Sequence, residues 1–150
     1  MIRDPYPQRI VCLTEESTEM LYLLGEEHRI VGISGFTVRP ARARKEKPKV
    51  SAYTSANIQK IVDLKPDLVI GFSDIQADIA KSLITLGMEV WVTNHRTIQG
   101  ILDFVVRLGA MVGKADQAIQ WTEAMVVKME SMKQGNEGKL RPRVFFEEWY

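Results

Sequence analysis

The sequence has 150 residues, of which 45% are apolar and 26% are charged. This composition is typical of a globular protein that can bury a core within one domain. The 20 Lys and Arg residues nearly balance the 19 Asp and Glu residues, which argues against nucleic acid or an anionic membrane surface as the main partner.

Cys12 is the single cysteine, so the chain can form no internal disulfide. It lies in an apolar stretch where a buried thiol acts as a small hydrophobe. No stretch approaches the ~18 consecutive apolar residues of a membrane span. Residues 1–9 are polar and do not resemble a secretory signal. The compartment is therefore open: the chain is either cytoplasmic or a mature form whose leader has been removed.

Short apolar segments alternate with segments of helical period along the first 112 residues. The continuous apolarity of four segments predicts parallel strands that helices cover on both faces; these are residues 10–13, 30–33, 68–71 and 90–92. The basic residues between 39 and 49 are flanked by prolines, and we expect a solvated loop there.

Start and stop signals delimit the helices between these strands. Gly25 ends the first helix, and Asn57 caps a short helix that begins at residue 58. Ser73 and Gln76 have the spacing of a capping box, which predicts a helix up to residue 86. Thr97 opens a longer helix that reaches residue 112. The alternation predicts an α/β fold in which a parallel sheet is flanked by helices.

The last third has a different pattern. Residues 114–134 predict one long helix of roughly 30 Å, at ~1.5 Å of rise per residue, and the apolar residues 144–146 predict the start of another strand. We therefore expect an N-terminal α/β lobe at residues 1–112, a long helix at 113–138, and the first strand of an incomplete second lobe at 139–150. An unpaired strand in this last segment would pair or swap with a second copy, so self-association through residues 139–150 is expected.

The catalytic motifs that a sequence can reveal are missing. No glycine-rich phosphate loop, no nucleophile elbow and no H-E-x-x-H or C-x-x-C metal motif is present. The residues therefore favour a binding protein over an enzyme, with no intrinsic cofactor or metal site.

Ligands of parallel α/β sheets bind outside the carboxyl ends of the strands. The polar or aromatic residues that follow the predicted strands, or lie in loops that reach the same edge, are the candidate ligand-binding residues: Glu15, Glu16, Phe36, Tyr53, Ser73 and Asp74. His95, after the last strand of the lobe, is expected at the rim of this site or in solvent.

Each candidate also has a structural interpretation. Glu15 and Glu16 are favourable at the positive end of a helix whether or not they meet a ligand. Ser73 is a helix cap, and Phe36 fits equally well as a core residue under its loop. Tyr53 lies in a loop rich in Ser, Ala and Thr, where a binding role is favoured.

The order of these segments resembles a known family. "IVCLTEESTEMLYLLG" at residues 10–25, "RIVGISGF" at 29–36 and "VSAYTSANIQKIVDLKPDLVIG" at 50–71 are similar to the cobalamin, siderophore and haem class of periplasmic binding proteins of ABC importers. The likeness continues through "LITLGMEVWVT" at 83–93 to "RPRVFFEEW" at 141–149. The cobalamin-binding members are the most similar.

The resemblance implies two α/β lobes joined by a rigid helix, with the ligand clamped between them. It places ligand-contacting aromatic residues at Phe36 and Tyr53, with Trp149 near the start of the second lobe's contribution. The implied ligand is a corrinoid such as cobalamin. A haem or ferric siderophore is the alternative, and Tyr53 would then ligate the iron of haem.

The resemblance also implies an ABC permease as partner, a location outside the cytoplasm, and docking through an acidic residue on the lobe surface. The matching position here is Gln59, which is uncharged, so nearby Asp63 is the alternative docking residue. A hypothesis of another class is an intracellular α/β enzyme or regulatory domain that keeps only the fold.

Overall fold

A parallel sheet forms the centre of the computed structural model, which describes residues 4–147. In this part of the chain the sheet has five strands in the order β3-β2-β1-β4-β5, and every neighbouring pair is parallel. The strands are β1 (Ile10–Cys12), β2 (Ile30–Ser34), β3 (Lys49–Ser51), β4 (Leu68–Phe72) and β5 (Val90–Thr93). The predicted α/β class is confirmed.

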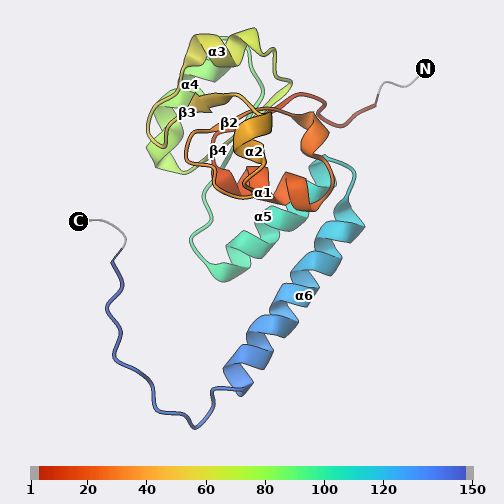
Figure 1. The fold of residues 1–150 in the computed structure, drawn as a ribbon. Helices are drawn as coiled ribbons and strands as arrows, with labels where there is room; N and C mark the ends of the chain where they lie inside the picture. The colour runs from red at the N-terminus through yellow and green to blue at the C-terminus, as the bar shows by residue number, and fades with distance from the viewer. Residues whose placement is uncertain (1–3, 148–150) are drawn as a thin grey trace.

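Six α-helices occur in the described residues. They are α1 (Glu15–Leu23), α2 (Ala43–Glu46), α3 (Ile58–Asp63), α4 (Ala77–Thr85), α5 (Ile98–Met111) and α6 (Ala115–Gln134). Two short 3-10 helices, η1 (Glu27–Arg29) and η2 (Asp74–Gln76), precede β2 and α4. Helices α3 and α4 lie on the upper side of the sheet in Figure 1, and α1 and α5 lie on the lower side.

Side-chain alternation divides the sheet into two hydrophobic layers. Ile10 and Ile70 point to one face and pack with side chains of α1 and α5. Val11 and Val69 point to the other face and pack with side chains of α3 and α4. All four are at most 1% exposed. Burial on both faces explains why these strands lack a polar alternation in the sequence.

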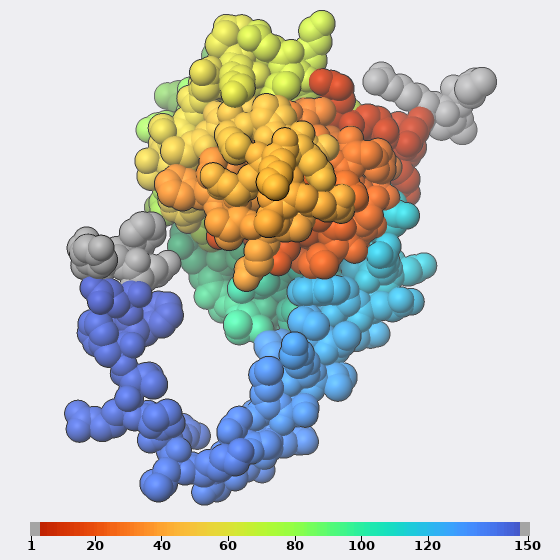
Figure 2. All heavy atoms as spheres, in the orientation of Figure 1, coloured from red at the N-terminus to blue at the C-terminus, as the bar shows by residue number. Residues whose placement is uncertain are grey.

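Helix α6 has 20 residues, and it is anchored to the lobe by its first turns. Ala118 is fully buried against α5, where a Cβ on Gly109 would lie only 2.3 Å from the Ala118 Cβ. Glycine is therefore required at this helix crossing. From residue 123 onward the side chains of α6 are mostly exposed, and the helix stands out from the lobe (Figures 1 and 2). The predicted long helix is confirmed.

Three details of the chain differ from the sequence predictions. The basic loop at residues 39–49 contains the one-turn helix α2 and leads into β3, neither of which was predicted. The strand predicted at 144–146 is wrong for the described structure, where residues 140–147 have no regular structure. The side chains at 144–146 are 82–87% exposed, because no described strand lies beside them to pair with their backbone. The division into an N-terminal lobe, a connecting helix and the start of a second lobe stays a prediction.

Candidate functional site

The order of the strands creates a crevice between β1 and β4. The chain leaves β1 toward α1 on one face of the sheet and leaves β4 toward α4 on the other. Loops that diverge in this way leave an opening at the carboxyl edge, which is where open α/β sheets bind their ligands. The candidate site is therefore the edge formed by the segments that follow β1, β2, β3 and β4.

The side-chain amide of Gln76 spans this crevice, and Gln76 is only 1% exposed. Its Nε2 donates to the backbone oxygens of Leu13 at 3.2 Å and Tyr53 at 3.0 Å. Its Oε1 accepts a hydrogen bond of 3.0 Å from the Phe72 backbone N–H. One side chain therefore joins three of the loops that form the edge.

Ser73 is a helix cap, as its structural interpretation expects, but the return bond of a capping box is wrong, because the Gln76 amide turns into the crevice. The Ser73 N–H donates instead to the Thr93 backbone oxygen at 2.6 Å. The Ser73 hydroxyl accepts from the Ile75 N–H at 3.3 Å, and Ser73 has a φ of 58° and is 2% exposed. These contacts support a structural role for Ser73, and its contact with a ligand stays a prediction.

The two aromatic candidates lie on neighbouring loops at the carboxyl edge. Phe36 is 60% exposed, so the interpretation of Phe36 as a core residue is wrong. Tyr53 is half-buried in the loop between β3 and α3. A hydrogen bond of 2.7 Å from the Gly35 N–H to the Ser51 backbone oxygen holds the end of β3 against the loop that carries Phe36.

The acidic candidates differ in their surroundings. Glu15 is exposed and Glu16 half-buried in the first turn of α1. That position suits both a favourable helix-end charge and a ligand contact. Asp74 is exposed, and its carboxylate lies 3.1 Å from the guanidinium of Arg96. Arg96 also lies over the Phe72 ring at 5.4 Å, so the Asp74 charge has a partner on the β5 side of the edge.

His95 lies in the segment after β5, beside this edge, and is not free in solvent. Its ring is half-buried between Phe72 and Phe104, with ring centroids 4.8 Å and 5.2 Å away. Its Nδ1 is buried and has no hydrogen-bond partner among the described residues. An aromatic packing role is the one that the geometry supports.

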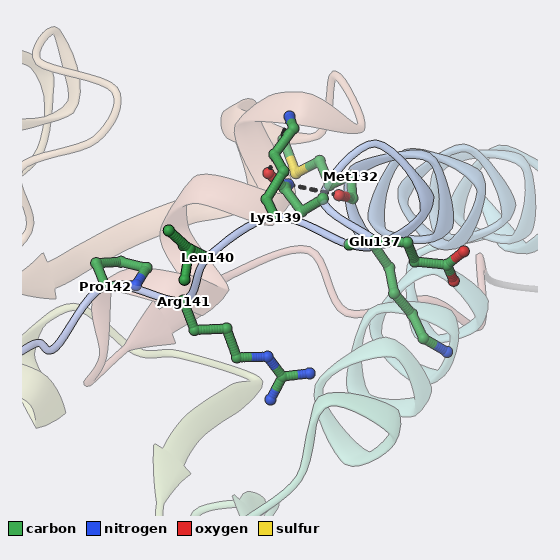
Figure 3. A pocket seen from close by; sticks show the side chains of 9 residues that line it. Met132, Glu137, Lys139, Leu140, Arg141 and Pro142 are labelled. Carbon is green, nitrogen blue, oxygen red and sulfur yellow. Dashed lines mark hydrogen bonds between the residues drawn. The ribbon is translucent and has the colours of Figure 1, made fainter.

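Two hollows of about 580 Å³ mark the surface of the described chain. The first runs along α4 beside the outer strand β5, and Ser73, Asp74 and Asn94 are among its lining residues. The second lies between the end of α6 and the segment that follows, where Met132 and Leu140 are among the lining residues (Figure 3). This second hollow belongs to the projecting part of the chain and not to the carboxyl edge.

The described residues give little support for a nucleophilic cysteine or a metal site. Burial raises the pKa of Cys12 to about 12, so its thiol is neutral at physiological pH. Between residues 4 and 147, no three His, Cys, Asp or Glu side chains gather in a way that would hold a metal ion. In the same range no helix is both long enough and apolar enough to cross a membrane.

The predicted docking residues are neighbours on α3, and both are exposed. The Gln59 Nε2 donates to the Asp63 Oδ1 at 2.7 Å. Trp149, the remaining candidate for ligand contact, lies outside the described residues.

Comparison with known proteins places this arrangement in a family. The profile for "Periplasmic binding protein" matches residues 10–150. The chain belongs to this family. The vitamin B12-binding protein of Salmonella typhi is 29% identical over 140 residues, which are 93% of this chain and 52% of that protein. The chain thus spans about half the length of this relative.

Solved structures support the fold. The periplasmic vitamin B12 binding protein of Vibrio cholerae has a TM-score of 0.76 at 23% identity, over 88% of this chain and 52% of that structure. A periplasmic heme binding protein from Pseudomonas aeruginosa has a TM-score of 0.78 at 21% identity, over 85% and 46%. The matched family and the Salmonella relative are binding proteins, so at the level of the family the expectation of a protein that is not an enzyme is supported.

Proposed function

We propose that this chain is the N-terminal lobe of the substrate-binding component of an ABC importer, and that its ligand is a corrinoid. The observation that carries the proposal is the carboxyl edge, where an exposed aromatic side chain and a half-buried one lie on adjoining loops beside a crevice. The vitamin B12-binding relative in Salmonella, which aligns with 93% of the chain, supports the corrinoid as ligand.

The proposed binding is reversible and non-covalent. The rings of Phe36 and Tyr53 cover an apolar face of the corrin macrocycle, because large flat side chains bury much area with few rotatable bonds. Glu15 and Glu16 accept hydrogen bonds from the polar edge of the ligand, as carboxylates do. Ser73 and Asp74 complete that polar side of the edge, and Trp149 contributes from the start of a second lobe.

Haem is the second candidate ligand. The heme binding protein from Pseudomonas aeruginosa shares the fold with a TM-score of 0.78. Tyr53 carries a phenol at the carboxyl edge, and a phenolate is a known axial ligand of haem iron. In this alternative Tyr53 is an iron ligand and not only a flat surface for the ring. A ferric siderophore is the third candidate.

The family also suggests where the protein works. We propose that it acts outside the cytoplasm and passes its ligand to an ABC permease. Docking would use the exposed face of α3, where Gln59 and Asp63 lie side by side.

Titration of the full-length protein with cyanocobalamin, haem and a ferric siderophore tests the choice of ligand. The corrinoid proposal predicts saturable binding of cyanocobalamin and no Soret shift on addition of haem. A Soret shift that Tyr53→Phe abolishes would assign the site to haem. Absence of binding to all three would leave the alternative of an α/β enzyme or regulatory domain with the fold only.

A further inference from the structure

Gln76 is placed to control the loop that carries Tyr53. This loop makes a hydrogen bond of 2.8 Å between the Ala52 N–H and the Ser55 oxygen, and it is closed by one of 2.8 Å between the Asn57 N–H and the Val50 oxygen. Both bonds are local to residues 50–57. In the described chain, the hydrogen bond that joins residues 52–56 to a distant segment is the one from Gln76 Nε2 to the Tyr53 oxygen, at 3.0 Å.

We propose that Gln76 is the positioning residue of the binding edge, which fixes the Tyr53 loop before a ligand arrives. This inference rests on the proposed function, since it assigns Tyr53 to the ligand. Both amide protons of Gln76 are used, one on Leu13 and one on Tyr53, while the amide oxygen accepts from Phe72. The loop after β3 is thereby held at a fixed distance from β1 and β4.

The surroundings of Gln76 fit an amide closely. A Cβ on Gly71 would lie 3.1 Å from the Gln76 Oε1, nearer than an ordinary contact, so glycine in β4 lets the amide approach. Glutamate would keep an acceptor for Phe72 but bring a carboxylate against two backbone oxygens. Methionine has a similar length and can neither donate nor accept strongly. Only the glutamine side chain satisfies the three partners together.

A loop that is fixed before binding lowers the entropy that the ligand must overcome. Loss of the Gln76 amide therefore weakens binding through the mobility of Tyr53, although Gln76 itself is buried away from the surface. The residue would affect affinity without a ligand contact.

The test compares Gln76→Met with Gln99→Met in the full-length protein. Gln99 is an exposed glutamine whose side chain donates to Asp103 within α5 at 2.9 Å, so it controls for the chemical change. Hydrogen exchange is measured on the unliganded protein, and affinity is measured with cyanocobalamin. In Gln76→Met, exchange of the amides at residues 52–57 should rise relative to those of β1 by about tenfold, the factor for one ordinary hydrogen bond. The cyanocobalamin dissociation constant should rise by a similar factor, and Gln99→Met should change neither.

Two results would overturn the positioning role: unchanged exchange of residues 52–57 in folded Gln76→Met, or a loosened loop with unchanged affinity. If Gln76→Met loosens the loop but the wild-type protein binds no cyanocobalamin, the result would support the role of Gln76 in fixing the Tyr53 loop. It would overturn the corrinoid proposal. If Gln76→Met does not fold, side-chain amide exchange measured by NMR on the wild-type protein tests the positioning role. The Gln76 side-chain amide protons should exchange about a hundredfold more slowly than those of Gln99, as expected for a buried, bonded group, and equal rates would refute the role.

Discussion

The Glu26 Oε1 and the Lys114 Nζ lie 3.4 Å apart, which joins the turn after α1 to the residue that precedes α6. Glu26 is 5% exposed and also pairs with the buried guanidinium of Arg29. Arg29 in turn donates to the Pro7 backbone oxygen at 2.8 Å. This ionic cluster sets the base of α6 at the opposite edge of the sheet from the candidate site.

Glu26→Gln should destabilise the chain by about 3 kcal/mol, because it leaves the Arg29 cation buried without a counter-charge. Urea unfolding measures the change. Glu27→Gln is the matched control: half-buried Glu27 pairs at 2.8 Å with the exposed guanidinium of Arg42, and loss of a pair so open to solvent should change stability by less than about 1 kcal/mol. Equal unfolding midpoints for the two variants would contradict a stabilising role for the cluster.

Gln59→Glu should strengthen association with the cognate permease if docking follows the acidic pattern of the family. The substitution adds a carboxylate one turn from Asp63, so it extends an existing acidic position on the exposed face of α3. A pull-down with the permease measures the effect. Asp63→Asn provides the opposite change and should weaken the association. Unchanged or weaker capture of Gln59→Glu would count against this surface.

The 150-residue chain should self-associate through residues 139–150. Leu140, Val144, Phe145 and Phe146 are 82–100% exposed on a segment without regular structure, and exposed apolar strands readily pair with another copy. Light scattering at tens of micromolar, roughly the range in which such segments associate, should show a dimer. Removal of residues 139–150 should give a folded monomer. A monomeric complete chain would refute this prediction, and a dimer that survives the truncation would place the interface elsewhere.

The parallel sheet was predictable because its inner strands are apolar on both faces, as Ile10, Val11, Val69 and Ile70 show. The strand β3 escaped prediction because it has three residues, of which only Val50 is buried. Its position at the edge of the sheet requires no apolar pattern. The proline-flanked basic stretch before it indicates a loop and not a strand.

The candidate edge was predictable as a region, because the ends of parallel strands meet in space, but its internal contacts were not. Gln76 follows Ser73 at the spacing of a capping box, and a local pattern cannot distinguish an amide that returns to its own helix from one that bonds to Leu13 and Tyr53. Those partners are 63 and 23 residues away in sequence. Only the fold brings them together.

Corrinoid binding at the carboxyl edge is tested most directly by titration of full-length Tyr53→Ala with cyanocobalamin. The variant should lose roughly 1–3 kcal/mol of binding free energy, the range for removal of a stacked aromatic side chain. Tyr6→Ala is the matched control, because Tyr6 is 40% exposed and lies beside Gly113 and Lys114, at the other edge of the sheet. Weakened binding in Tyr53→Ala with wild-type binding in Tyr6→Ala would support the site. Wild-type affinity in Tyr53→Ala would contradict it.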